Sequence, residues 1–225
     1  MRIAVIQFPG SNCDWDAFYA LKDYLDVDPV MVWHKQTDLD KADALIIPGG
    51  FSFGDYLRCG AIARFSPIMS AVKAFAEQGG AILGICNGFQ ILCEAGLLPG
   101  ALIRNQNLRF CCRSCELLVE DTAGRFNRKN LGERLYLPVA HGEGNYRIDE
   151  TGLVELTAHN QILFRYTGSS GNPNGSVSDI AGICNRQGNV WGMMPHPERA
   201  VNSFHPSQDG LTLLKAWLDA PVISC

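Results

Sequence analysis

Long apolar runs and an excess of positive charge are both missing from this sequence of 225 residues. No run approaches the ~20 consecutive apolar residues that a membrane-spanning helix needs, so we expect no such helix. The 19 Lys and Arg residues are outnumbered by 23 Asp and Glu residues, and the formal net charge is −4. This balance argues against a nucleic acid or an anionic membrane as the main partner.

Signals for export and for nucleotide binding are missing as well. The first residues read as a strand that ends in a turn at Pro9-Gly10, and not as a signal peptide, so we expect a cytoplasmic protein. The phosphate-binding pattern G-x-x-x-x-G-K-[ST] does not occur. We therefore expect no ATP site and no cofactor in this chain.

The nine cysteines form no paired pattern. Their number is odd and their spacing irregular, which disfavours a disulfide framework and favours reduced thiols. Cys112 and Cys115 have the C-x-x-C spacing of zinc and redox sites, but no second ligand pair accompanies them. They also lie in a strand-like run, residues 108–120, in which residues three apart face opposite sides. We therefore predict no metal site.

What the sequence does contain is the composition of a compact globular protein, with 47% hydrophobic residues, 19% charged residues and 23 glycines. The length suits one α/β domain. No linker, internal repeat or low-complexity segment divides the chain, so we predict a single domain over residues 1–225.

Short apolar runs alternate with helical patterns in the first half of the chain, which predicts a three-layer α/β fold with a mostly parallel sheet. The runs that predict strands are 2–8, 30–33, 44–47 and 81–85. The patterns that predict helices begin at Trp15 and after Ser66-Pro67. Later in the chain the pattern is β-rich, with expected strands at 108–120, 135–140, 153–157, 162–166, 180–185 and 190–194, and a last helix at 207–218.

The stretch from Gly79 to Gln90 contains a candidate nucleophile. An apolar run ends at Cys86, and a helical pattern begins directly after it. The order Gly84-Ile-Cys86-Asn-Gly88 has the form of a nucleophile elbow, in which glycines allow a sharp strand-to-helix turn that leaves the middle side chain exposed. The N–H groups at a helix N-terminus favour the thiolate, which is the nucleophilic form. A buried structural cysteine is the alternative.

A thiolate nucleophile needs a base that moves protons, and the base needs an acceptor that orients it. His196 stands out among the five histidines, because Glu198 follows two residues later and an extended H-x-E segment points both side chains the same way. Pro195 and Pro197 favour that extended form. We predict that His196 faces Cys86 and that Glu198 fixes the tautomer of the imidazole. A surface loop is the alternative for such a triplet.

Glycines at the end of another strand suggest a third part of the site. Pro48-Gly49-Gly50 follows the run 44–47, which we expect to lie beside the strand that ends at Cys86. Such glycines let backbone N–H groups approach a substrate oxygen, so we predict an oxyanion hole formed by the N–H groups of Gly50 and Asn87. A tight turn after a strand is the plainer alternative.

These three motifs, in this order and at these separations, resemble those of the class I, triad-type glutamine amidotransferases. Further strings over nearly the whole chain resemble the glutaminase subunits of phosphoribosylformylglycinamidine synthases: Phe51-Ser-Phe-Gly-Asp55, His141-Gly-Glu-Gly144, Asn172-Pro-Asn-Gly-Ser176 and Gly192-Met-Met-Pro-His-Pro-Glu-Arg199. The cysteine-rich stretch Cys111–Cys115 departs from the usual form of these subunits, but it lies outside the catalytic motifs.

The resemblance implies a flavodoxin-like fold with a β-rich segment after the elbow helix. It also implies that Cys86 attacks glutamine to form a thioester, with His196 as general base and acid and Glu198 as its orienting partner. Gln90 would contact the bound glutamine, and residues 141–144 would border the same pocket.

The resemblance further implies the partners. Ammonia would pass to a synthetase subunit that uses ATP and Mg to convert phosphoribosylformylglycinamide to phosphoribosylformylglycinamidine in purine biosynthesis. A small accessory subunit would be a further partner.

Two other functions remain open. A stand-alone cysteine hydrolase, such as a γ-glutamyl peptidase, would use the same elbow without a partner. A non-catalytic α/β binding module would keep Cys86 only as a packed thiol. We interpret the basic run Arg125–Lys129 as a solvated turn, with docking to a partner as the alternative.

Overall fold

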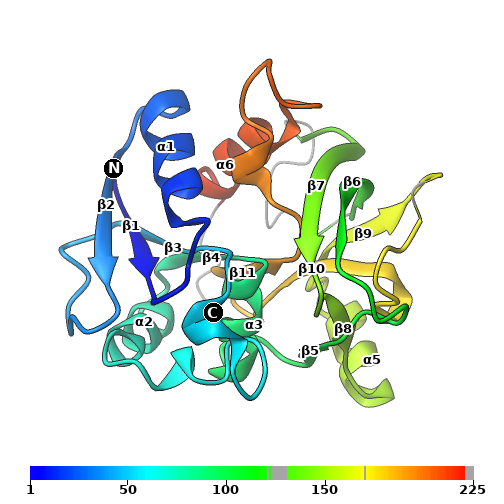
Figure 1. Cartoon of the computed structure of the whole chain (residues 1–225), viewed down its shortest axis with the longest axis horizontal. Coiled ribbons are helices and arrows are strands. Elements are labelled where there is room, and N and C mark those ends of the chain that lie inside the picture. Colours follow the sequence, from blue (N-terminus) through cyan, green and yellow to red (C-terminus); the bar gives the residue numbers. More distant parts are fainter. Residues whose placement is uncertain (121, 123–130, 170, 221–225) are drawn as a thin grey trace.

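Figure 1 shows a computed structural model of the chain, which describes residues 1–120, 122, 131–169 and 171–220. The basic run 125–129 lies outside these residues. Within them, nine strands form one sheet, in the order β2 (Asp28–Trp33), β1 (Arg2–Gln7), β3 (Ala44–Ile47), β4 (Ala81–Ile85), β11 (Val190–Met193), β10 (Ile180–Cys184), β9 (Ile162–Thr167), β6 (Cys111–Val119) and β7 (Arg134–His141). A separate small sheet pairs β5 (Ala101–Ile103) with β8 (Asn145–Arg147).

The strand pairing of the large sheet changes from parallel to antiparallel at β11. All of its pairings from β2 to β11 are parallel, which confirms the predicted α/β core. The strands β10, β9, β6 and β7 continue the sheet with antiparallel pairings. Most strands of the predicted β-rich segment after the elbow helix therefore extend the same sheet, while β5 and β8 pair separately.

Helices cover both faces of the parallel half, which gives the predicted three layers (Figure 1). Helices α1 (Asp14–Tyr24) and α6 (Asp209–Leu218) lie on one face, and α2 (Ile68–Glu77) and α3 (Asn87–Glu94) lie on the other. The inner strands β3 and β11 are buried throughout, which is why their sequences are continuous apolar runs. No helix in the described part of the chain has the length and apolar character to cross a bilayer.

The buried face of α1 is made of small and aliphatic side chains and not of its aromatic residues. Ala17, Ala20 and Leu21 are buried, whereas Trp15 is 49% exposed and stacks on Tyr19 with 5.7 Å between the ring centroids. Small side chains let the helix approach the sheet closely, so the large rings pack on one another outside it.

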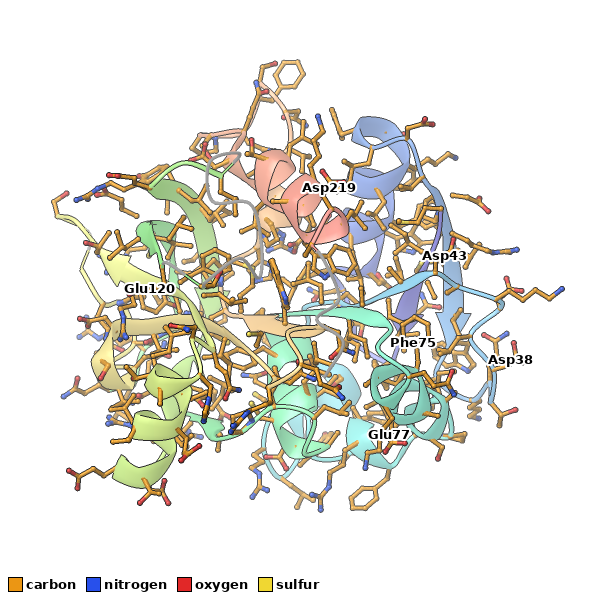
Figure 2. The ribbon with its side chains drawn as sticks, turned by 180° about the vertical axis from the view of Figure 1, so that it is seen from behind. Asp38, Asp43, Phe75, Glu77, Glu120 and Asp219 are labelled. Atoms are coloured by element: carbon orange, nitrogen blue, oxygen red, sulfur yellow. The ribbon has the colours of Figure 1, made fainter. Side chains whose placement is uncertain are left out.

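Helix α2 ends where the two glycines predict. The N–H groups of Gly79 and Gly80 bond to the carbonyls of Ala76 and Phe75, and Gly79 has a φ of +85°. Charged side chains such as Glu77 project outward at this edge of the molecule (Figure 2). The tight end of α2 leads the chain directly into β4 and so to residue 86.

One predicted strand, residues 153–157, is wrong. These residues lie in helix α5 (Glu150–Ala158), whose first turn is capped by Asp149: its carboxylate accepts a hydrogen bond of 2.7 Å from the N–H of Gly152. Of the residues in this helix, Leu156 is buried while Val154 is 61% exposed. The apolar residues follow the period of a helix, because Leu156 is buried and Leu153 packs against the core while Val154 faces solvent.

Candidate active site

Cys86 lies at the turn between β4 and α3, with φ 50° and ψ −103°, a conformation that residues with a side chain rarely adopt. Two glycines make this turn possible. A Cβ on Gly84 would lie 2.5 Å from Cδ1 of Leu92, and a Cβ on Gly88 would lie 1.9 Å from the carbonyl oxygen of Ile47. The chain therefore forms the sharp strand-to-helix turn that the sequence predicts, with the helix pressed against the neighbouring strand. The expectation that the turn leaves the middle side chain exposed is wrong, because Cys86 is 5% exposed.

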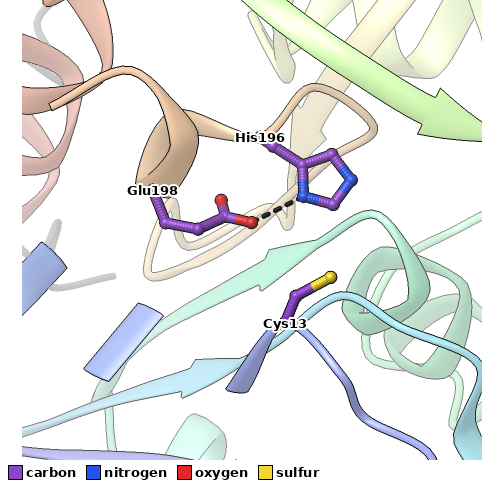
Figure 3. Close-up of side chains that lie close together, drawn as sticks. All are labelled: Cys13, His196 and Glu198. Carbon is purple, nitrogen blue, oxygen red and sulfur yellow. Dashed lines mark hydrogen bonds and ion pairs between the residues drawn. The ribbon is translucent and has the colours of Figure 1, made fainter. Parts of the chain in front are cut away.

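His196 and Glu198 reach Cys86 because β11 lies beside β4. Met193 pairs with Ile85, so the chain that leaves β11 emerges next to the elbow. His196 Nδ1 bonds to Glu198 Oε1 over 2.5 Å, and both side chains are 1% exposed (Figure 3). The carboxylate accepts, so Nδ1 carries the proton, and Nε2 is the nitrogen left for chemistry.

The charges around His196 make it an acid at neutral pH. Burial lowers its pKa, but the Glu198 carboxylate and the Cys86 sulfur raise it more, to about 10. Cys86 acts on the ring through its charge and as a hydrogen-bond partner.

The loop after β3 lies against the same imidazole. β3 pairs in parallel with β4, as predicted, and Ile47 stands opposite Gly84. A Cβ on Gly49 would lie 2.8 Å from Cε1 of His196, so only a glycine leaves room for the ring in this position.

Asn87 joins this loop to the elbow helix. Its Oδ1 accepts a hydrogen bond of 3.1 Å from the N–H of Ser52. As the first residue of α3, Asn87 has an N–H group with no acceptor inside the helix, which suits an oxyanion. Gly50 has a φ of +134°, and its Cα faces the backbone of Ser11 and Asn12. The contribution of Gly50 to an oxyanion hole stays a prediction.

A pocket of about 260 Å³ opens beside the elbow helix. Gln90 connects the elbow helix to the pocket lining. Its Nε2 donates to the carbonyl of Glu143 over 2.6 Å, and its Oε1 accepts from the side chain of Asn87 over 2.9 Å. Gly142 and Glu143 thus line the pocket. That glutamine binds there, as the resemblance implies, stays a prediction. The pocket lining carries both signs of charge, which suits a zwitterionic amino acid: Asp55, Glu143, Arg104 and Arg109.

Cys13 is a site residue that no sequence pattern revealed. It precedes α1, and its Sγ lies in one group with atoms of His196 and Glu198, all within 4.8 Å of one another (Figure 3). Three such side chains could bind a metal ion, but the guanidinium of Arg199 lies 3.1 Å from the sulfur and, together with the imidazolium, repels a cation. Burial and the Glu198 carboxylate raise the pKa of Cys13 to about 12, so it stays a neutral thiol beside the reactive one.

The described residues thus bring Cys86, His196, Glu198, Asn87 and Gln90 together at the carboxyl ends of parallel strands. Residues 1–217 match the CobB/CobQ-like glutamine amidotransferase domain, and the chain belongs to this family. It is a glutaminase of the kind that serves as the amidotransferase component of a carbon-nitrogen ligase.

Solved structures agree with this family. The chain is similar to PurLQS from Thermotoga maritima, with a TM-score of 0.85 and 41% identity over 97% of both chains. The glutaminase domain of Trypanosoma brucei CTPS with bound acivicin gives a TM-score of 0.61 at 13% identity, covering 98% of this chain and 95% of that one. A glutamine amidotransferase from Thermotoga maritima gives 0.58 at 14% identity, covering 97% and 83%. The last two show the fold alone, and all three confirm the predicted fold class.

Proposed function

We propose that this chain works as the glutaminase subunit of phosphoribosylformylglycinamidine synthase. It hydrolyses glutamine and supplies the ammonia to a synthetase subunit in purine biosynthesis. The observation that carries the activity is the buried Glu198–His196 pair beside Cys86 on a strained elbow. The likeness to PurLQS over 97% of both chains supports the biological role.

The first half of the reaction forms a thioester. The Cys86 thiolate attacks the side-chain amide carbon of glutamine, and the carbonyl oxygen becomes an oxyanion that the N–H groups of Asn87 and Gly50 stabilise. The His196 imidazolium gives its Nε2 proton to the amide nitrogen. The carbon–nitrogen bond then breaks, ammonia leaves, and a γ-glutamyl thioester remains on the sulfur.

The second half hydrolyses this thioester. The neutral imidazole takes a proton from water while the water oxygen attacks the thioester carbon. The carbon–sulfur bond breaks, glutamate leaves, and the thiolate and imidazolium are restored. Glu198 keeps its hydrogen bond to Nδ1 throughout, so one nitrogen, Nε2, both delivers and collects the proton.

The docking face for the synthetase surrounds the mouth of the pocket. Phe51, Leu108 and Phe110 line this mouth, and Tyr56 and Leu57 follow the lining residue Asp55. All of these side chains are exposed, Leu57 to 91%. An apolar surface of this kind marks an interaction site. Ammonia has to reach the synthetase without loss to water, so the partner has to cover this mouth.

The other members of the complex follow from the same proposal. ATP and Mg act in the synthetase subunit, since the sequence of this chain has no phosphate-binding loop. The resemblance to the glutaminase subunits of these synthases supports a small accessory subunit as a third member and the cytoplasm as the location.

The test compares two nitrogen sources in the assembled synthase. Cys86→Ala should abolish glutamine-dependent synthesis and leave synthesis from added ammonia unchanged, because only the thioester route needs the sulfur. Cys112→Ala, at an exposed cysteine of β6, is the control for loss of a thiol. Loss of both activities in Cys86→Ala would contradict the division of labour.

A second assay separates the alternatives. Ammonia release from glutamine is measured for the purified chain alone and with the cognate synthetase and its substrates. A sharp rise on addition of the synthetase supports a glutaminase completed by its partner. Equal and vigorous release in both conditions would indicate an autonomous hydrolase, and no release in either would indicate a binding module.

A further inference from the structure

One backbone segment, residues 138–143, contacts three parts of the site. The carbonyl of Pro138 accepts a hydrogen bond of 2.8 Å from the N–H of His196. The carbonyl oxygen of Ala140 lies 3.7 Å from the sulfur of Cys86. The carbonyl of Glu143 accepts from the side chain of Gln90 over 2.6 Å. The positions of the base, the nucleophile and Gln90 therefore all depend on this segment, which contributes no side chain to the proposed chemistry.

Asn105 holds this segment from one side. Its Nδ2 donates to the carbonyl of His141 over 2.9 Å and to that of Arg109 over 2.8 Å. Its Oδ1 accepts from the N–H of Gly144 over 2.9 Å and lies 3.1 Å from Nδ1 of His141. Two carbonyl acceptors settle the orientation of the amide, so Oδ1 is an acceptor and Nδ1 of His141 has to carry a proton.

Asn174 holds the same histidine from the other side. Its Oδ1 accepts from the N–H of Ser176 over 3.0 Å and from the hydroxyl of Ser176 over 2.7 Å. Its Nδ2 therefore points the other way, 3.4 Å from Nε2 of His141 and 3.2 Å from the hydroxyl of Tyr166. Because Nδ2 is a donor, Nε2 of His141 has to be an acceptor, and the ring has to be neutral.

The surroundings of His141 agree with a neutral ring. The side chain is buried, and the charged group that acts on it is His196, across the segment. Burial, with a further contribution from the positive charge of His196, lowers the pKa of His141 to about 4. The two histidines of the site thus differ in charge at neutral pH, one cationic and reactive, the other neutral and held at both nitrogens.

We propose that Asn105, His141 and Asn174 are positioning residues of the glutaminase, which act by holding the carbonyls of residues 138–143 against the base, the nucleophile and Gln90. The proposal rests on the glutaminase function above. It gives a purpose to two motifs that the reaction leaves unused, His141–Gly144 and Asn172–Ser176.

Kinetics of the assembled synthase test the proposal. Asn174→Ala removes the donor to Nε2 of His141, so the segment loses one of its two supports. We expect kcat/KM for glutamine to fall at least ~10-fold. The value of kcat should fall because Cys86 and His196 are less well placed, and KM should rise because Gln90 is less well placed. Synthesis from added ammonia should not change. Gln78→Ala, at an exposed amide after α2 whose backbone φ of −79° suits alanine, is the matched control.

The tautomer of His141 gives a readout that kinetics alone lack. Side-chain nitrogen NMR of the ¹⁵N-histidine-labelled chain should show one neutral ring protonated at Nδ1 between pH 5.5 and 8.5, and His141→Gln assigns it by its disappearance. A ring protonated at Nε2, or one that titrates near the ordinary value, would overturn the proposal even if Asn174→Ala failed to fold.

The outcomes separate this proposal from the function on which it rests. If the wild-type synthase makes no use of glutamine, the proposed function is wrong. If the wild type is active and Asn174→Ala behaves like Gln78→Ala, the function stands and the positioning role is wrong.

Discussion

Removing the charge of Glu198 is the perturbation whose consequence the structure defines best. In Glu198→Gln the side-chain oxygen can still accept the hydrogen bond from Nδ1 of His196, so the ring keeps its orientation and loses only its counter-charge. Burial then acts on the pKa of His196 with the Cys86 sulfur alone opposing it. We expect this pKa to fall from about 10 to its ordinary value of 6.5 or lower.

The size of the effect follows from the protonated fraction. At pH 8, a group with a pKa of about 10 is ~99% protonated, whereas one with a pKa of 6.5 is ~3% protonated. The supply of the acid that releases ammonia therefore falls ~30-fold. The value of kcat at pH 8 should therefore fall by about 30-fold, which is less than the whole contribution of general acid catalysis, roughly 10²–10⁴-fold.

The charge also makes stability depend on pH. The folded-state pKa of His196 lies above its unfolded value of 6.5, so the ion pair with Glu198 stabilises the fold fully below about pH 6.5. This contribution is lost as the pH rises toward 10. The Tm of the wild type should fall over this range by more than the Tm of Glu198→Gln.

The assay is glutamate release by the assembled synthase between pH 6 and 10. The alkaline limb of the profile should move to lower pH in Glu198→Gln, whereas Glu198→Ala should lose activity at every pH because it also loses the orienting bond. Glu155→Gln, at an exposed residue of α5, is the control for charge. A Glu198→Gln enzyme within ~3-fold of wild type at pH 8, or one with an unmoved alkaline limb, would refute the reasoning.

Three further predictions concern neighbours of the triad. Cys13→Ala should keep glutaminase activity within ~3-fold, because the neutral thiol of Cys13, with its pKa of about 12, is not a nucleophile. A glutamine-like alkylating agent should still modify one cysteine, Cys86, and mass spectrometry of the labelled peptide decides this. Gly49→Ala should lower kcat ~10²-fold or more with little change in fold, because its Cβ would lie 2.8 Å from Cε1 of His196. Kinetics and circular dichroism test this, and full activity would show that the ring does not need its present position. The folded-state pKa of His141 is about 4, below its unfolded value of 6.5, so its neutral form stabilises the fold fully above pH 6.5 and this contribution is lost as the pH falls toward 4. The Tm of the wild type should drop over that range, and an equal drop in His141→Gln would contradict this origin.

Local signals in the sequence predicted the elements that position the site. The glycines around Cys86 lie within five residues of one another, and a turn so short depends on little beyond the residues that form it. The pairing of His196 with Glu198 is equally local, since two residues of extended chain are enough to point both side chains the same way. Parallel strands could be inferred because burial on both faces requires continuous apolar runs.

Local signals failed where packing or a cap decided. Residues 153–157 form part of α5 because Asp149 caps its first turn, although their apolar side chains suggested a strand. The helical pattern from Trp15 did not show which face of α1 is buried, and close approach to the sheet selected Ala17, Ala20 and Leu21 for that face.

The sequence by itself determined which residues can react: a cysteine on a strand-to-helix turn, and a histidine with its carboxylate two residues away. Only the tertiary structure decided which groups surround them. The parallel pairing of β4 with β11 brings His196 to Cys86 across more than a hundred residues of chain. Cys13 reaches the same place from the loop after β1, and the carbonyls of residues 138–143 reach it from the end of β7. The reason is physical: a turn and an H-x-E pair are set by neighbours in the chain, whereas burial, charge and hydrogen bonding at the site are set by segments that meet only when the sheet forms.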